Sequence, residues 1–255
     1  MWNWFVQLLF MILKSIENVT GDWGLAIIVL TIIIRILIMP LMTKSTASSA
    51  KMQALQPRMK QIQEQYADNP AKQAEEMQKF YAENKFNPLG GCLPLILQMP
   101  IFFGLFTMIR TYVPEDAHFY NILPSLSESA RSALSNIGMP DAIVYIILVI
   151  AFGVLTLIPM LMNSKNTPEE QRGQSLMMGV VMAIMMVWIG WGLPAAVNLY
   201  YDASAIWQVV QQKVVTQRVM DKVKAETAAK LEAQGQKTNI EVIRREKKKR
   251  PRKKS

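Results

Sequence analysis

The stretch LAIIVLTIIIRILIMPLM, residues 25–42, decides the fold class of the chain. It is apolar at nearly every position and, within a predicted span at 24–43, is long enough to cross the ~30 Å hydrocarbon core of a bilayer. A fifth segment, 195–215, mixes polar with apolar residues and is expected to span with one face turned away from lipid. The sequence therefore predicts an all-α integral membrane protein with five transmembrane helices, the other three lying at 89–112, 142–163 and 176–193.

The composition favours the same class. Hydrophobic residues make up 51% of the 255 residues, charged residues make up 18%, and the mean hydropathy is +0.16. These values exclude an ordinary soluble domain, a collagen-like chain and a wholly disordered one. The single cysteine, Cys92, and the single histidine, His118, allow neither an internal disulfide nor a Cys/His cluster. We therefore expect no metal site and no cofactor.

The distribution of charge predicts the orientation. Residues 213–255 hold fifteen Lys and Arg against five Asp and Glu, or +10, so the rest of a chain of net charge +9 carries −1. Basic residues also gather in the polar regions 44–88 and 164–175, whereas the loop 113–141 holds only Arg131. By the positive-inside rule the first two regions and the tail are cytoplasmic, and the N-terminus lies outside. The tail, 216–255, is expected to be largely disordered and to attract RNA or anionic lipid, although a merely solubilising role is the alternative.

Three polar regions contain helical patterns. Residues 44–88 predict a cytoplasmic helical hairpin with a second arm capped by Asn69, expected to be mobile because its only large apolar contact is its own partner arm. Residues 1–20 predict an extracytoplasmic interfacial amphipathic helix. The outer loop 113–141 predicts one short helix after Ser125, where Ser125 and Glu128 have the spacing of a capping box.

Arg35 is a charged residue inside the first span. It lies ~16 Å below the outer end of the span at 1.5 Å rise per residue, close to the bilayer midplane, where a charge costs roughly 2.5–3.5 kcal/mol. We therefore expect Arg35 to face a water-filled cavity or a buried partner. The alternative is a structural arginine neutralised by Asp202 or by helix-end carbonyls.

Other polar residues occur at similar depths in three predicted spans. Thr31 lies one turn above Arg35, and Gln98 lies in the second span. The fifth span carries a stripe at three- and four-residue spacing, formed by Asn198, Tyr201, Ala205, Gln208 and Gln212. Taken singly, these residues could merely hydrogen-bond neighbouring helices. As a set around an arginine they predict a hydrated groove.

The order of several motifs resembles the YidC family of membrane protein insertases, with their mitochondrial and chloroplast relatives. The motifs are Thr31 and Arg35 as T-x-x-x-R, Leu55-Gln56-Pro57, Asn87-Pro88 before GGCLPLILQMPIFFGLF at 90–106, and Leu199-Tyr200-Tyr201. The resemblance implies a non-enzymatic insertase and chaperone of a bacterial plasma membrane, with a hydrophilic groove centred on Arg35. It also implies nascent clients with acidic translocated segments, translating ribosomes and the Sec translocon as partners, and a functional monomer. Carried over by motif, the client-contacting residues would be Thr31, Arg35, Gln98, Met99, Phe102 and Tyr201, to which the polar stripe adds Asn198 and Gln208.

Two departures from that family pattern bear on function. No large extracytoplasmic domain is evident, so the chain resembles the short, Gram-positive form. Asp202 is an acid that the pattern does not include, and it could partly neutralise Arg35. Two other functions stay open: a small anion-binding secondary transporter, and a ribosome-tethering membrane protein in which Arg35 is dispensable.

Overall fold

The computed structural model describes residues 2–84, 93–164 and 169–233. Within these ranges the chain is helical apart from turns and two isolated bridges, Phe119 with Leu123 and Ser129 with Pro194. The helices are α1 (Trp2–Thr20), α2 (Trp23–Gln65), α3 (Pro70–Glu83), α4 (Leu93–Tyr112), α5 (Ala130–Asn136), α6 (Ala142–Ser164), α7 (Glu169–Gly190), α8 (Ala195–Gln211), the π-helix η2 (Gln212–Thr216) and α9 (Gln217–Ala233).

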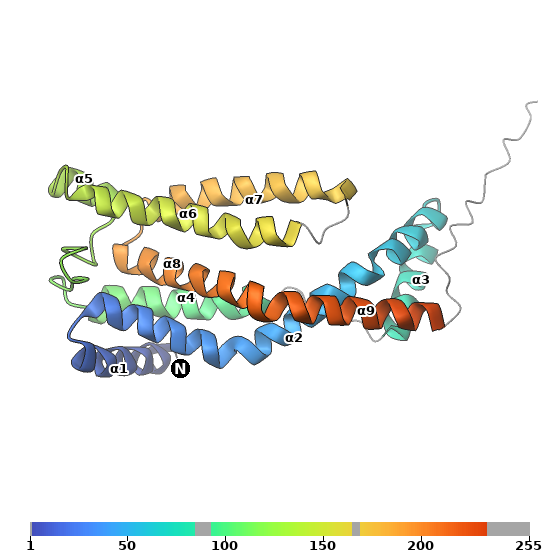
Figure 1. The fold of residues 1–255 in the computed structure, drawn as a ribbon, viewed down its shortest axis with the longest axis horizontal. Helices are drawn as coiled ribbons and strands as arrows, with labels where there is room; N and C mark the ends of the chain where they lie inside the picture. The colour runs from blue at the N-terminus through green and yellow to red at the C-terminus, as the bar shows by residue number, and fades with distance from the viewer. Residues whose placement is uncertain (1, 85–92, 165–168, 234–255) are drawn as a thin grey trace, which may run out of the picture.

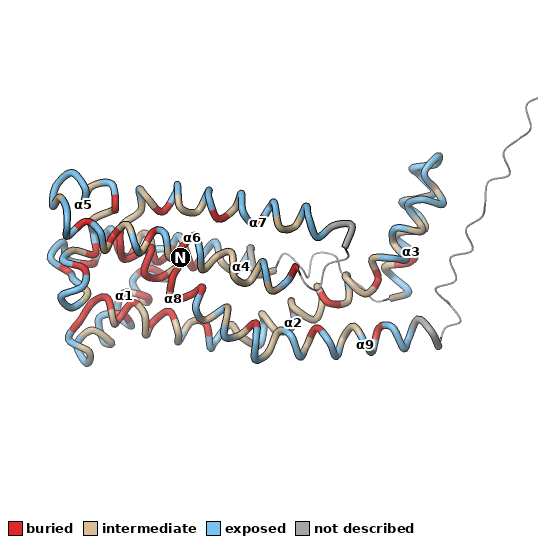
Figure 2. The backbone as a smooth tube through the Cα atoms, turned by 45° about the horizontal axis from the view of Figure 1, so that its top comes forward, coloured by how far each residue is buried: buried red, intermediate tan, exposed pale blue. Residues whose placement is uncertain are grey.

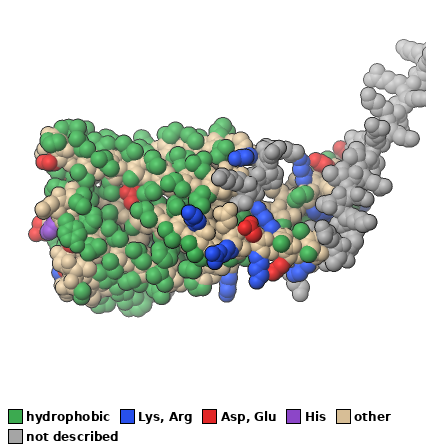
Figure 3. All heavy atoms as spheres, viewed as in Figure 1, with side chains coloured by type: hydrophobic (Ala, Val, Ile, Leu, Met, Phe, Trp, Pro, Cys, Tyr) green, Lys and Arg blue, Asp and Glu red, His purple; other side chains and the backbone are tan. Residues whose placement is uncertain are grey.

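Three described helices are long and apolar enough to cross a membrane: α2, α6, and α7 over Arg172–Gly190. α4 is a shorter apolar helix over Ile96–Tyr112. Figure 3 shows apolar side chains covering the visible face of the bundle, with Lys, Arg, Asp and Glu gathered mostly toward the end that holds α3 and α9. The prediction of an all-α membrane protein is confirmed, whereas the number of spans stays a prediction.

α2 is longer than the predicted span, because the first arm of the predicted hairpin continues it without a break. Pro40 and Pro57 lie inside this helix of 43 residues, so neither starts a new one. We call residues 44–65 the polar arm of α2; with α3 it forms the hairpin at the right of Figure 1. At the turn, the side chain of Asn69 accepts a hydrogen bond from the amide of Lys72 at 3.1 Å, with Pro70 at the first helical position, as the sequence predicts.

The main core lies at the opposite end of the bundle from the hairpin. Figure 2 shows the buried residues concentrated in the half that holds α1, α5 and α8. From here on we use the name outer loop for residues 113–129, the part of the predicted loop that precedes α5. This segment packs into the core through Leu123 and Leu126, which are 1% and 0% exposed. The predicted short helix forms as α5, but its capping box is Ser129 with Ser132 instead of Ser125 with Glu128. Ser125 instead accepts a hydrogen bond from the hydroxyl of Tyr145 at 2.9 Å.

Asp22 ties this end of the bundle together. Its side chain is 2% exposed, and Oδ1 caps α2 by accepting from the amide of Leu25 at 2.7 Å. Its other oxygen accepts from the amide of Tyr120 at 2.6 Å, where the backbone takes a left-handed φ of 44°. The loop also approaches α2 closely at Gly24, where a Cβ would lie 2.4 Å from Phe119. One carboxylate therefore fixes both the start of α2 and the outer loop.

α1 packs against protein along its apolar side. Phe10 stacks on Tyr112 of α4 and on Trp23 of α2, with ring centroids 5.0 and 6.5 Å apart. Phe5 lies against Gly104, where a Cβ would come within 2.5 Å of its ring. Because Gly104 lies two turns before the C-terminal end of α4, α1 extends along the bundle; its position at a membrane interface stays a prediction.

The chain is helical well past the predicted start of a disordered tail. η2 and α9 continue α8 to Ala233, and α9 lies along the polar arm of α2. The physical reason is a buried stripe on α9 in which Met220 is 4% and Thr227 is 7% exposed. The hairpin therefore has a second packing partner besides its own arms, contrary to the prediction. The rest of the predicted tail, 234–255, lies outside the described residues.

Candidate functional site

The candidate site is built around Arg35, which lies on the apolar part of α2, twelve residues after Trp23. The side chain is 6% exposed. Among the residues described by the structure, no hydrogen bond or ion pair involves its guanidinium. The hydroxyl-bearing rings of Tyr200 and Tyr201 on α8 lie within electrostatic range of it. Arg35 is therefore a buried cation next to the tyrosines of α8, and its guanidinium makes no hydrogen bond or ion pair with the described residues.

Gln98 links α4 to the tyrosines next to Arg35. Its Nε2 donates a hydrogen bond to the hydroxyl of Tyr200 at 2.7 Å. Tyr200 is 2% exposed, so this contact holds an amide and a phenol together inside the protein. The bond links two helices whose sequence separation is 102 residues. α4 and α8 therefore meet through these two side chains, next to Arg35 of α2, whereas the depth of this contact in a membrane stays a prediction.

Tyr201 forms the apolar wall next to this polar cluster. Its ring stacks on Phe152 of α6 at 4.7 Å between centroids and tilts against Phe102 of α4 at 5.6 Å. Tyr200 and Tyr201 are themselves 5.2 Å apart. An aromatic bridge from α4 through α8 to α6 therefore lies beside Arg35. Such rings offer apolar surface to a passing helix and a polar tip at the hydroxyl.

Two predicted site residues make hydrogen bonds that hold the fold. The hydroxyl of Thr31 donates to the carbonyl of Ile27 in the same helix at 2.7 Å, and the side chain is 1% exposed. The amide of Asn198, also 1% exposed, donates to the carbonyl of Gly190 at 3.0 Å and so closes the turn between α7 and α8. These contacts give each residue a structural role whether or not it meets a client.

Two other predicted site residues, Met99 and Gln208, lie at the surface. Met99 on α4 is 48% exposed, and Gln208 on α8 is exposed. Gln208 lies two turns beyond Tyr201 on one side of α8, or about 10 Å along the helix. Further along the same stripe, Gln212 donates from Nε2 to Oδ1 of Asn163 at 2.6 Å. The structure thus brings Arg35, Gln98, Phe102 and Tyr201 together and spreads the rest over a larger surface.

The suggested pairing of Arg35 with Asp202 is not formed. No ion pair joins the two side chains, both of which belong to the described part of the chain. At 100° per residue, Asp202 points about 200° around α8 from Tyr200, which faces Gln98, so the acid lies on the opposite side of the helix. Its Oδ1 is buried without a hydrogen-bond partner, as is Oδ1 of Asn198 one turn earlier.

The sequence predictions missed two residues that shape the site. Tyr200 belongs to a family motif but not to the predicted site, although a buried phenol needs a hydrogen-bond partner and the sequence predicts Gln98 at a similar depth. Asp22 was not singled out, although an aspartate just before a long apolar run is a helix-start signal. His118 is exposed in the outer loop, and no group of three or more metal-binding side chains occurs among residues 2–84, 93–164 and 169–233.

Backbone hydrogen bonds tie the outer loop to the helices at its end of the bundle. The first amides of α8, which have no partner within their own helix, donate to the outer loop instead. Ala195 bonds the carbonyl of Glu128 at 2.7 Å, and Ala196 bonds that of Leu126 at 3.0 Å. Arg131 also donates from its backbone to the carbonyl of Trp191 at 3.2 Å. The outer loop is therefore tied to the start of α8, the helix that carries Tyr200 and Tyr201.

Comparison with known proteins places this geometry in a family. The family model described as 60Kd inner membrane protein matches residues 15–223. "Membrane protein insertase YidC" of Aquifex aeolicus is 34% identical over 210 residues, covering 82% of this chain and 38% of the relative. The protein of the same name from Caldanaerobacter subterraneus is 34% identical over 203 residues, covering 80% of this chain and 89% of the relative.

A solved structure shares the fold. It is described as "Active YidC insertase crystal structure with the first transmembrane domain resolved", and it superposes with a TM-score of 0.60 at 29% identity. The match covers 83% of this chain and 46% of that one. The chain thus spans less than half the length of several relatives and nearly all of another. It belongs to the 60Kd inner membrane protein family and is a relative of the YidC membrane protein insertases.

Proposed function

We propose that this protein is a membrane protein insertase and chaperone that acts through a hydrated groove beside Arg35. One observation carries the proposal: a buried arginine in an apolar helix, without a hydrogen bond or ion pair to the described residues and next to Tyr200 and Tyr201, with Gln98 bound to Tyr200. A charge held in this way inside a membrane protein is by default a functional site. The names of the relatives support insertion as its function.

The mechanism needs no covalent step. A client segment that crosses ~30 Å of hydrocarbon must desolvate its charges and its backbone. A groove with polar walls shortens that path, and Arg35 offsets part of the desolvation cost of an acidic client residue. The rings of Phe102 and Tyr201 offer apolar surface to the client helix, which then leaves sideways into lipid because of its own hydrophobicity.

For the topology we propose five spans formed by α2, α4, α6, α7 and α8. The end that holds the outer loop would lie outside the cell, with the N-terminus, and the hairpin and α9 would lie in the cytoplasm of a bacterium. The distribution of charge supports this orientation, because the loop between α4 and α6 holds one Arg and no Lys. Clients would then enter from the side that carries the hairpin.

The partners follow from the same chemistry. The basic run RREKKKRPRKK at 244–254 suits a polyanion, and we propose ribosomal RNA as its main target with anionic lipid as a second. Clients with acidic translocated segments are the substrates, with the Sec translocon as a partner for larger ones. We propose that the protein acts as a monomer.

Reconstituted insertion tests the proposal directly. Protein in liposomes is presented with a single-span client whose N-terminal tail is acidic, and protease protection of the tail is measured. We expect Arg35→Ala to lower insertion several-fold and Arg35→Lys, which keeps the charge, to retain most of it. A client with a neutral tail is the matched control and should be affected less.

The outcomes separate the alternatives. Insertion that is equal for Arg35 and Arg35→Ala removes the charge mechanism and leaves the insertase. No insertion by either protein favours the transporter or the tether. Uptake of an anionic solute that requires Arg35 would then decide for the transporter.

A further inference from the structure

The last helical run of the chain changes neighbours along its length. α8 packs between α2 and α6, whereas α9 lies along the polar arm of α2 (Figure 1). The two are joined by η2, a π-helix of five residues. π-Helical turns are rare and occur frequently at functional sites. The change of neighbours therefore coincides with an unusual backbone segment.

η2 separates two anchoring points. Gln212, at its start, is 7% exposed and holds Asn163 of α6 through a hydrogen bond of 2.6 Å. The next buried side chain is that of Met220, eight residues further on. The side chains between them, 213–219, are exposed or half-buried. About two turns of helix thus connect the bundle to α9 with no buried contact of their own.

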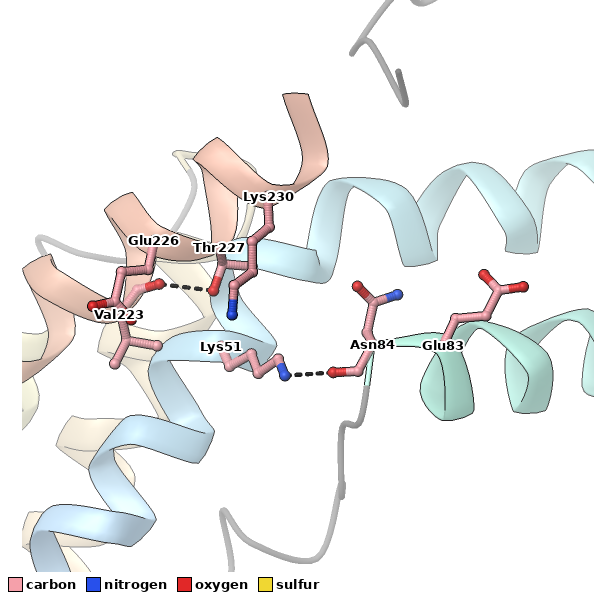
Figure 4. Close-up of a pocket in the computed structure, with 7 residues that line it drawn as sticks. All are labelled: Lys51, Glu83, Asn84, Val223, Glu226, Thr227 and Lys230. Atoms are coloured by element: carbon pink, nitrogen blue, oxygen red, sulfur yellow. Dashed lines mark hydrogen bonds between the residues drawn. The ribbon is translucent and has the colours of Figure 1, made fainter. Parts of the chain in front are cut away.

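α9 contacts the hairpin through the polar arm of α2. Met220 and Thr227 are its buried side chains over residues 217–230. Between Thr227, Val223 and the hairpin lies a cavity of about 360 Å³, lined on the hairpin side by Lys51 and by Asn84 at the end of α3 (Figure 4). Of these two residues only Met220 is apolar, so α9 buries little apolar surface compared with the main core.

The two arms of the hairpin are linked to each other at this cavity. Lys51 of the polar arm donates a hydrogen bond to the backbone carbonyl of Asn84, so α2, the end of α3 and α9 meet around one cavity. The hairpin's own apolar cluster is small, with Leu55 and Phe80 as its buried members. Holding or freeing α9 must therefore change how firmly the hairpin is held.

We propose that α9 is a releasable strap, hinged at η2, which fixes the hairpin when it is docked and frees it when it detaches. In the docked position Met220 and Thr227 anchor the strap on the polar arm of α2. In the released position the strap swings about the exposed turns after Gln212. The hairpin then loses the contact with α9, keeps its small cluster around Leu55 and its own hydrogen bonds, and gains mobility.

Cross-linking across the cavity measures the docked fraction. Glu83→Cys on α3 and Lys230→Cys on α9 replace exposed side chains that line the same cavity, in full-length protein in liposomes with Cys92→Ser. A short bismaleimide should join them efficiently. Adding Met220→Ser should lower the yield several-fold and raise protease cleavage in the hairpin. Ala225→Ser, at an exposed position of the same helix, is the matched control and should change neither.

Two results would overturn the strap. One is a yield that Met220→Ser leaves unchanged, and the other is an equal fall with Ala225→Ser. If Met220→Ser lowers the thermal transition of the whole protein, Thr227→Asp, placed further from the bundle, replaces it and must show the same loss of cross-linking.

Deleting Val214 tests the hinge separately. A π turn accommodates one residue more than an α turn, so the deletion should convert η2 into α-helix without rotating α9 away from α2. We expect cross-linking equal to that of the parent and slower amide exchange over residues 212–219. Exchange that does not slow would show that η2 is not where the strap moves.

Discussion

The two ends of the molecule are built differently. At the outer end, Asp22, Tyr145 and the first amides of α8 tie the loop to three helices over a large buried core. At the other end, the hairpin has a small cluster around Leu55 and Phe80, a contact with α9 in which Met220 and Thr227 are buried, and a cavity of about 360 Å³. The end with the outer loop shares one large core, whereas the hairpin end is held by small contacts outside that core. In the orientation that we propose, the end with the large core would lie outside the cell and the hairpin would lie where clients arrive.

A matched pair of leucines should show this contrast most strongly. Leu126 in the outer loop and Leu55 in the hairpin are each 0% exposed. Leu126→Ala should destabilise the whole bundle by about 2–5 kcal/mol, because the cavity opens in the shared core. Leu55→Ala should leave the global unfolding transition nearly unchanged and instead raise protease cleavage in the hairpin. Denaturant unfolding in micelles, with limited proteolysis, measures both, and equal global losses would contradict the comparison.

Asp22→Ala should have the next largest effect. It removes the cap of α2 and leaves the amide of Tyr120 without a partner, which together cost about 2–4 kcal/mol. Asp116, an exposed acid of the same loop, provides the control as Asp116→Ala, which should change stability little. Thermal unfolding followed by circular dichroism measures the difference. Equal transitions for both variants would show that the outer end does not depend on Asp22.

Gly104→Ala should loosen α1 by a smaller amount. The new Cβ would lie 2.5 Å from the ring of Phe5, so α1 must shift or Phe5 must turn, at about 1–3 kcal/mol. Gly173→Ala on α7, where no atom lies within 4 Å of the new Cβ, is the control and should be neutral or slightly stabilising. Amide exchange of α1 reports the change. Protection of α1 that equals that of the parent would show that the close approach is not needed.

The smallest effect concerns pH at the hairpin. On α3, a hydrogen bond from Lys79 lowers the pKa of Glu75, and the same bond raises the pKa of Lys79. The pair therefore stabilises α3 above the ordinary pKa of a glutamate, and this contribution is lost as the pH falls through the lowered pKa of Glu75. Because both groups are exposed, the change should be slight. Amide exchange of α3 should rise a little in acid, and Glu75→Gln should remove that component.

The sequence predicts the helices better than their contacts. The apolar run in α2, Arg35 within it and the cap at Asn69 all follow from local patterns, and the structure contains each of them. The contact of Gln98 with Tyr200 is different in kind, because depth along a helix places both residues at one level but does not fix which faces meet. Asp202 shows the same limit: two positions along α8 from Tyr200 are enough to turn it to the other side.

Tertiary packing overrode the local pattern in α9. The mean hydropathy of residues 217–233 is low, so composition favours disorder, yet Met220 and Thr227 are buried and the helix continues along the polar arm of α2. The capping box at Ser125 failed for a similar reason, since Tyr145 takes that residue's backbone groups. Neither partner can be identified from the neighbouring residues in the sequence.

α2 is continuous from Trp23 to Gln65, so a movement of its hairpin end can be transmitted along the helix to Arg35. Arg35 lies about 18 Å from the outer start of the helix and about 45 Å from Gln65, at 1.5 Å rise per residue. Asp22 fixes the first turn of α2, so a sideways displacement of the end at Gln65 tilts the helix about that first turn. Bending is easiest at Pro40 and Pro57, where a proline removes a backbone hydrogen bond. Pro40 lies within two turns of Arg35, whereas Pro57 lies much further along the helix. The flexibility of α2 at Pro40 therefore determines how far a displacement of the hairpin moves the Arg35 side chain.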